Sequence, residues 1–232
     1  MALFSLASRC LVSLRRHPSA VLLVVQLTAL VGYPFIENTT VGHAGLGVLG
    51  TAVLVVTTAM VRRTPWTTVV SVALAVPAVS MLALQAVRPM PHLLPWSAGL
   101  EALFYFYAAG SLIAYMLADR QATTDELFAA GATFTLLAWG FAYLFLALQA
   151  VLPPGSFTAS VNPEQARTWT ELMFLSFALL SSTGIGDVVP INPVARAVCS
   201  VEMFVGVIYL AAVVSRLIGL TLQSHPTAHG PD

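Results

Sequence analysis

The sequence contains little charge. Only 9% of its 232 residues are charged, and its ten basic residues are all Arg, without a single Lys. Soluble domains carry about 25% charged residues, so this deficit excludes an ordinary soluble enzyme. Because 58% of the residues are hydrophobic and the mean hydropathy is +0.85, the composition indicates an integral membrane protein.

A basic excess and a cysteine framework are also lacking. Ten acidic residues balance the ten Arg, whereas proteins that bind nucleic acid carry a basic footprint, so no nucleic-acid partner is expected. The two cysteines, Cys10 and Cys199, are far apart and provide neither a disulfide framework nor a metal-ligand spacing. No catalytic constellation is visible, and we expect neither enzyme activity nor a cofactor.

One glycine pattern has the spacing of a dinucleotide site without its context. Gly45-Leu-Gly47-Val-Leu-Gly50 lies within an apolar run, whereas a dinucleotide fingerprint follows a strand, opens a helix and precedes an acid. Small residues in an apolar run favour close helix packing instead. We therefore expect no nucleotide-binding domain.

Long apolar runs are what the sequence has in abundance. Runs near the ~20 residues that a membrane-spanning helix requires cover 19–36, 42–61, 66–86, 96–118, 127–151 and 195–219. Between the last two, the apolar run at 169–180 is too short to cross. A short helix that enters the membrane and returns is tolerated where protein or a water-filled cavity covers its backbone. The sequence predicts an all-α membrane protein with six transmembrane helices and a re-entrant pore helix between the fifth and sixth.

The loop charges orient these spans. Seven Arg fall on one side of the six-span arrangement: Arg9, Arg15, Arg16, Arg62, Arg63, Arg120 and Arg216. The other side has Arg88, Arg167 and Arg196. Because an excess of Arg marks the cytoplasmic side, we expect a multi-pass protein of the plasma or inner membrane, with both termini cytoplasmic and the re-entrant segment entering from outside.

The two terminal segments are expected to be short and cytoplasmic. Residues 1–18 contain Arg but no acid, which fits either an interfacial helix or an organelle transit peptide. No cleavage site follows, so the interfacial helix is favoured. Residues 221–232 are predicted to form a short disordered tail.

One turn lies between the short apolar run and the last span: Leu180-Ser-Ser-Thr-Gly-Ile-Gly-Asp-Val-Val-Pro190. A phosphate-binding turn needs a helix that starts directly after its glycines, but here the helix precedes them. The C-terminal end of a helix carries partial negative charge, so this turn is expected to face a cation. Thr168 and Glu171 predict a capping box at the start of that helix.

A short helix, hydroxyl residues, Gly-x-Gly-Asp and then Pro resemble the pore loop of the bacterial tetrameric potassium channel family. The resemblance is to members with six transmembrane helices, a single pore loop per subunit and no voltage sensor. It covers residues 168–220, including an inner helix with Gly206 and Arg216. It implies passive, K⁺-selective conduction by a homotetramer surrounded by membrane lipids. The fourth span, 96–118, contains no Arg, so steep voltage gating is not expected.

The resemblance divides the chain and assigns its site. It implies a pore domain at 127–220, with outer helix 127–151, pore helix 168–181, filter 182–187 and inner helix 195–219, beside a four-helix peripheral domain at 19–118. A filter replaces the ion's hydration shell with backbone carbonyls. The resemblance implies ion binding by the filter residues Ser182, Thr183, Gly184, Ile185 and Gly186, with K⁺ held by the carbonyls of the first four and Asp187 at the filter mouth. Glycine permits the backbone angles required there.

The inner helix adds further candidates. Gly206 is expected to be a gating hinge, or else a position where close packing on the pore helix leaves no room for a side chain. Val207, Leu210 and Val214 follow at helical spacing and would line the cavity. Acids within membrane spans are candidates for function, so Glu202 and Glu101 are possible modulatory residues; the plainer interpretation is a protonated, hydrogen-bonded carboxyl.

Three positions depart from the family pattern. The filter signature of the family is Thr-Val-Gly-Tyr-Gly-Asp, and Thr183 and Ile185 replace its Val and Tyr. Ala178 stands where well-known members have an acid that braces the filter. Two further interpretations therefore stay open: a weakly selective monovalent cation channel, and a non-conducting scaffold with the pore fold.

Overall fold

The structure is a computed structural model that describes residues 18–35, 65–87, 90–118 and 124–223. The expected span at 42–61, with its glycine pattern at 45–50, lies outside the described residues. So do residues 1–17 and 224–232, which hold most of the two expected terminal segments.

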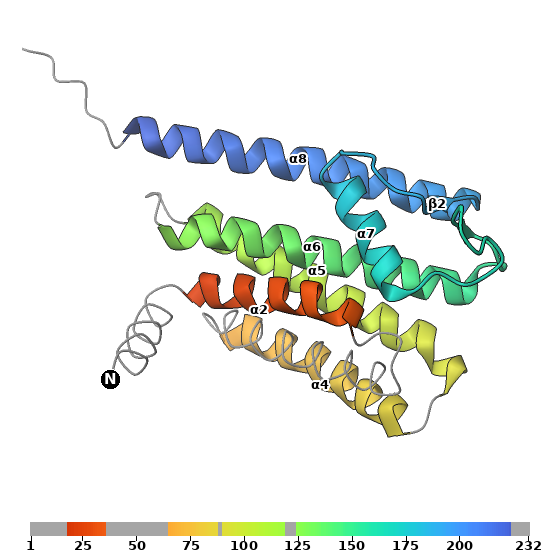
Figure 1. The fold of residues 1–232 in the computed structure, drawn as a ribbon. Helices are drawn as coiled ribbons and strands as arrows, with labels where there is room; N and C mark the ends of the chain where they lie inside the picture. The colour runs from red at the N-terminus through yellow and green to blue at the C-terminus, as the bar shows by residue number, and fades with distance from the viewer. Residues whose placement is uncertain (1–17, 36–64, 88–89, 119–123, 224–232) are drawn as a thin grey trace, which may run out of the picture.

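The described chain is almost entirely helical (Figure 1). Its α-helices are α2 (Pro18–Gly32), α4 (Pro65–Val87), α5 (Leu94–Ala118), α6 (Thr124–Val151), α7 (Trp169–Leu180) and α8 (Pro193–Gln223). The short 3₁₀ helix η1 (Tyr33–Phe35) follows α2, and η2 (Pro91–Leu93) precedes α5.

Four of these helical segments are long and apolar enough to cross a membrane. They are Pro18–Phe35, Leu94–Leu117, Thr124–Val151 and Pro193–Arg216, which match the first, fourth, fifth and sixth expected spans. The shorter apolar stretch Val69–Met81 lies within α4, at the third expected span. The prediction of a mostly helical membrane protein is confirmed at this level, and the number of six spans stays a prediction.

Helix α6 is the centre of the bundle. It packs against α5 and α2 on one side and against α7 and α8 on the other, while α4 lies on α5 (Figure 1). Most of its residues between Ala129 and Phe145 are buried. A helix surrounded by neighbours must be apolar all round, which explains why this segment shows no polar face.

Helix α7 is short and lies between α6 and α8 (Figure 1). Its 12 residues extend about 18 Å, less than the ~30 Å of a bilayer core. The predicted capping box is confirmed. The Thr168 N–H donates to Glu171 Oε2 at 2.7 Å, and the Glu171 N–H donates to Thr168 Oγ1 at 3.3 Å.

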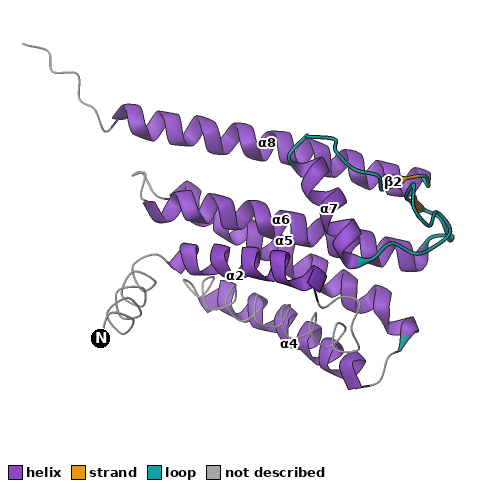
Figure 2. Ribbon diagram, viewed as in Figure 1, coloured by secondary structure: helices purple, strands orange, loops and turns teal. Residues whose placement is uncertain are grey.

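The loops on either side of α7 meet in a small antiparallel ribbon (Figure 2). Strand β1 (Phe157–Thr158) pairs with β2 (Val189–Pro190), and the Ile191 N–H donates to the Ser156 carbonyl at 2.9 Å. The all-helical expectation missed this ribbon because two-residue strands have no periodicity to detect. The ribbon joins the chain that leaves the glycine turn to the loop that leads into α7.

Several predicted boundaries are wrong by a few residues. The disordered tail was expected from 221, but α8 continues to Gln223, because loss of hydropathy marks the end of a span and not the end of a helix. The last helix begins at Pro193, since Pro suits the first helical turn. Helix α6 begins at Thr124, and Asp125 and Glu126 in its first turn complement the positive end of the helix.

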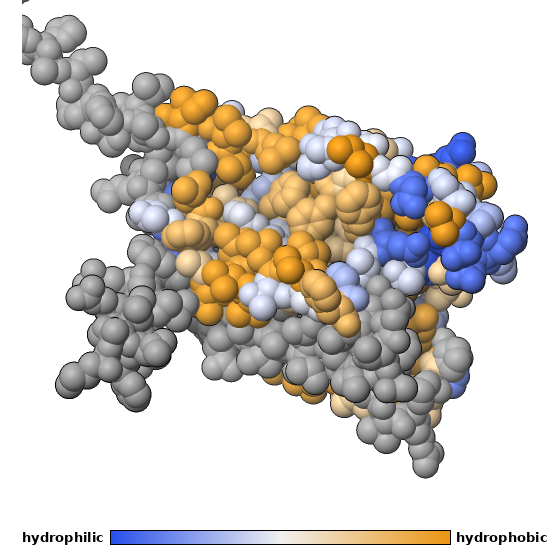
Figure 3. Space-filling model, viewed as in Figure 1, coloured by the Kyte–Doolittle hydropathy of each residue, from blue (hydrophilic) through white to orange (hydrophobic). Residues whose placement is uncertain are grey.

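The face of the molecule seen in Figure 3 separates, over the described residues, into apolar and polar regions. Apolar residues cover the helical part, and polar residues gather at the end where the loop between α6 and α7 lies (Figures 1 and 3). This distribution fits helices in lipid with loops in water.

Candidate functional site

The N-terminal end of α7 is held by a buried arginine. Arg167 is only 3% exposed, and its guanidinium donates to the carbonyls of Val161 at 3.3 Å and Asn162 at 2.5 Å. It also contacts the Glu171 carboxylate at 3.3 Å. A guanidinium has five donors and must be paired when buried, so these acceptors define one conformation for the loop that enters the helix.

The side chain of Gln149 in α6 binds the backbone of Arg167, directly before the start of α7. Its Oε1 accepts from the Arg167 N–H at 2.8 Å, and its Nε2 donates to the Arg167 carbonyl at 3.0 Å. Sequence analysis did not single out Gln149. A Gln in the last turn of an otherwise apolar helix is the signal that could have found it.

Aromatic rings pack behind the start of α7. The Trp169 ring lies 5.1 Å from that of Trp139, 5.0 Å from that of Tyr33 and 6.0 Å from that of Tyr143. These partners come from α6 and η1, so they connect α7 to the first helical segment, Pro18–Phe35, as well as to its immediate neighbour α6. Aromatic pairs contribute about 0.5–1.5 kcal/mol each beyond the burial of their area.

The glycine turn begins directly at the C-terminal end of α7. The Thr183 N–H and the Gly184 N–H both donate to the Ala178 carbonyl, at 3.1 and 3.3 Å. Ser182 and Gly184 have φ of 58° and 66°, in the left-handed region. We expected glycine to supply this conformation at both Gly184 and Gly186, but Gly186 does not use it and Ser182 does.

Every residue from 182 to 187 is exposed in the single chain. The Ile185 side chain is 68% exposed and lines a groove between α7 and the turn. The other residues lining this groove are Phe174, Phe177, Ala178, Ser181 and Thr183. The segment expected to bind ions therefore lies on an open face, and the space behind it is apolar.

Gly206 in α8 makes the closest helix approach at this site. A Cβ at this position would lie 2.1 Å from the carbonyl oxygen of Leu180, the last residue of α7. Such a distance is far inside contact range, so no other residue fits without a shift of backbone. This geometry favours the packing interpretation of Gly206, and a hinge role stays a prediction.

The expected cavity-lining residues lie on the face of α8 that points away from the bundle. Val207, Leu210 and Val214 are 53%, 38% and 53% exposed. Tyr209 points the other way, and its hydroxyl donates to the Ala130 carbonyl at 2.6 Å. The described helices thus hold one face of α8 and leave an apolar face uncovered.

The two membrane acids have different surroundings. Glu202 is 0% exposed and its Oε1 contacts the Ser176 hydroxyl of α7, which also lies 2.9 Å from the Ala138 carbonyl of α6. Glu101 in α5 is also buried and faces the phenols of Tyr105 and Tyr143. Among the described residues, one carboxyl oxygen of each acid, Glu101 Oε2 and Glu202 Oε2, has no hydrogen-bond partner. Glu202 contacts a hydroxyl that also contacts a third helix, whereas Glu101 interacts with the phenol of Tyr143.

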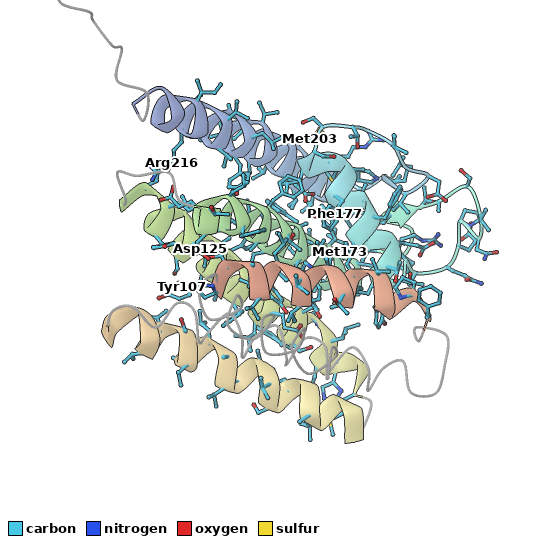
Figure 4. The ribbon with its side chains drawn as sticks, turned by 60° about the vertical axis from the view of Figure 1, so that its left-hand side comes forward. Tyr107, Asp125, Met173, Phe177, Met203 and Arg216 are labelled. Atoms are coloured by element: carbon cyan, nitrogen blue, oxygen red, sulfur yellow. The ribbon has the colours of Figure 1, made fainter. Side chains whose placement is uncertain are left out.

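Polar contacts also connect the helices at the end of the bundle where α2 and α6 begin, which holds Asp125 and Arg216 (Figure 4). The Ser19 N–H and hydroxyl donate to the Asp125 carboxylate at 3.2 and 2.9 Å, which joins α2 to α6. Arg216 of α8 pairs with Glu126 at 3.2 Å. Arg167 and Arg196 lie at the other end, so the described Arg are separated as the topology analysis requires, although the cytoplasmic side stays a prediction.

This arrangement defines a class of protein: a membrane-helix bundle that holds a short capped helix and an exposed glycine turn beside a long apolar helix. A family model described as "Ion channel" matches residues 103–223, which is more than half of the chain. The chain therefore belongs to this ion channel family, and membership of a family of channels points away from an enzyme. Searches of curated proteins and of solved structures found no match.

Proposed function

We propose that this protein is a potassium channel, in which a homotetramer conducts K⁺ passively through a filter formed by residues 182–187. The observation that carries the proposal is the junction between α7 and the turn. The negative end of a buried helix meets a segment whose backbone is left-handed at Ser182 and Gly184. Carbonyls of Ser182, Thr183, Gly184 and Ile185 would replace the hydration shell of K⁺.

The uncovered faces support assembly. Residues 182–187 are exposed, as are Val207, Leu210 and Val214 on the outward face of α8. Monomeric proteins rarely leave large contiguous apolar patches in water. In a tetramer the filter and this face would surround a common axis, with the apolar face lining a cavity that can close by dewetting. Lipid would cover the remaining apolar surface.

Gating by moving charges is not part of the proposal. Helix α5, which corresponds to the fourth span, contains no Arg, whereas voltage sensors carry several. We expect a channel that is not steeply voltage-gated, in a plasma or inner membrane with both termini cytoplasmic.

A second candidate is a weakly selective monovalent cation channel. The groove behind the filter supports it, because the side chains of Ile185 and Ala178 that line it are apolar. The polar ties of the turn end at Thr183 and Gly184, and a filter whose Ile185 side chain has no hydroxyl to bond is freer to change its spacing. A non-conducting scaffold with the pore fold is the remaining alternative.

Ion flux from liposomes that contain the purified protein separates these functions. Potassium and sodium gradients are compared, and barium is added as a blocker. Potassium flux that barium blocks supports the selective channel, and equal flux of both ions supports the weakly selective one. No flux from a confirmed tetramer at any pH supports the scaffold and contradicts both channels.

Two matched glycine variants test whether the turn is the filter. Gly184→Ala and Gly155→Ala both force Ala into a left-handed backbone, at φ of 66° and 81°, with no atom near the new Cβ. Each should cost about 1–2 kcal/mol of stability. Flux should be lost in Gly184→Ala and retained in Gly155→Ala. Equal flux in both variants would contradict a filter at this turn.

A further inference from the structure

The hydroxyl of Ser176 lies between two oxygen atoms from different helices. Its Oγ is 2.9 Å from the Ala138 carbonyl of α6 and within hydrogen-bond distance of Glu202 Oε1 of α8. Ser176 and Glu202 are both 0% exposed. The three groups join α6, α7 and α8 in one polar contact inside an otherwise apolar region.

The number of available protons decides how this contact is made. A serine hydroxyl has one proton to donate, a carbonyl only accepts, and an ionised carboxylate also only accepts. With Glu202 ionised, one of the two contacts would place lone pairs against each other without a proton between them. With Glu202 protonated, its O–H donates to Ser176 Oγ, and the Ser176 O–H donates to the Ala138 carbonyl. Only the protonated carboxyl satisfies both distances.

Among the described residues, no charged side chain faces Glu202 to compensate an anion. Facing it are the Ser176 hydroxyl from α7, the Ala138 carbonyl from α6 and the Cys199 thiol from its own helix. The described acids of α6 and α7 stand in the first turns of those helices. The described cations of α8 are occupied elsewhere, Arg196 by the Pro190 carbonyl and Arg216 by Glu126. An unpaired buried charge is strongly unfavourable.

We propose that Glu202 is a neutral carboxylic acid that latches the inner helix α8 to the pore helix α7 through Ser176. Gly206 lies one turn further along α8 and touches the Leu180 carbonyl, so the latch supports the contact nearest the filter. Loss of the proton leaves the single Ser176 hydroxyl proton to serve two acceptors, so either the contact with the Ala138 carbonyl or the contact with Glu202 is lost. It also leaves a buried anion that requires water, so the junction of α6, α7 and α8 loosens and the start of the filter loses support.

Infrared difference spectroscopy tests the proton directly. The purified protein should show the C=O stretching band of a protonated carboxylic acid at neutral pH, where model carboxyl groups in water are ionised. The component of this band that belongs to Glu202 should be lost in Glu202→Gln and kept in Glu101→Gln, the matched variant at the other buried acid, whose own contribution is thereby separated. A band that is unchanged in Glu202→Gln would overturn the proposal. Ser176→Ala offers a second route, because loss of the hydrogen bond should shift the same band.

The latch also makes the stability of the protein depend on pH. The donor is present while Glu202 keeps its proton and is lost as the pH rises, so the thermal midpoint of the wild type should fall with increasing pH. The amide of Glu202→Gln donates to Ser176 without titrating, so the midpoint of this variant should fall less. Equal pH dependence in both proteins would overturn the latch.

Control of conduction by the latch rests on the proposed function. Potassium flux of the wild type should fall over the same pH range in which its thermal midpoint falls, whereas flux through Glu202→Gln should stay constant. If the protein conducts at no pH, the proposed channel function is contradicted. The infrared band and the pH dependence of the thermal midpoint would still test whether Glu202 forms the protonated latch. Wild-type flux that is constant while the midpoint falls would contradict the link between latch and conduction.

Discussion

The two ends of α7 are held in different ways. At its N-terminal end, hydrogen bonds from Arg167, Gln149, Thr168 and Glu171 hold the loop and the first turn, and Trp169 packs among three other rings. These contacts come from several elements of the chain, so this end is fixed by the fold of the bundle.

The C-terminal end is held mainly by hydrogen bonds between neighbouring residues and opens outward. The turn donates two N–H groups to the Ala178 carbonyl, and Gly206 packs on Leu180, but residues 182–187 remain exposed. Under the proposed function, a segment that faces an ion would leave its carbonyls free. Each chain would then fix the position of α7, and the proposed filter would become complete when subunits meet.

The largest effect is expected at the close contact of the C-terminal end. Gly206→Ala places a Cβ against the Leu180 backbone, so α7 and α8 must move apart, at a cost of about 3 kcal/mol. Thermal unfolding and size-exclusion chromatography of the purified protein would measure the loss of stability and of assembly. Gly110→Ala in α5 is the control, because nothing lies near its Cβ. An unaltered midpoint in Gly206→Ala would show that α7 and α8 are not closely packed.

A smaller effect is expected at the buried arginine of the N-terminal end. Arg167→Met removes the donors to three loop carbonyls, of Val161, Asn162 and Gln165, and to Glu171, which should cost about 2 kcal/mol. Flux should fall in parallel with the thermal midpoint, because the loop positions the whole pore helix. Arg196→Met is the control, because Arg196 is exposed. This substitution should change the free energy of unfolding by less than about 0.5 kcal/mol. A similar loss of stability in both variants would contradict a specific role of Arg167 in holding the loop before α7.

The smallest effect is expected at the helix cap. Thr168→Ala removes the side-chain acceptor for the Glu171 N–H and should cost about 1 kcal/mol. Thr168→Ser keeps the acceptor and should restore most of this loss. The selectivity for potassium over sodium should be unchanged in both, because the filter lies at the other end of α7. A change in selectivity on loss of the cap would mean that the two ends are coupled, contrary to the comparison.

The sequence predicted the local elements well, because each depends on neighbouring residues. Hydropathy located the apolar helices, and the spacing of Thr168 and Glu171 predicted the capping box that the structure contains. It did not predict the roles of Gln149 and Ser176, whose partners are Arg167 of the following loop and Ala138 and Glu202 of other helices. Neither residue belongs to a local motif, so only three-dimensional proximity shows what it does.

The sequence by itself determined that this is a helical membrane protein with a short helix ending at a glycine turn. Low charge and apolar length are properties of the chain, and a turn of this spacing after a helix favours a cation because of the helix dipole. Tertiary structure decided how that helix is held: by a buried arginine at one end, by a glycine that touches backbone at the other, and by a serine between two oxygens in the middle. These contacts depend on distances between separate helices, and packing sets those distances only when the whole bundle has formed.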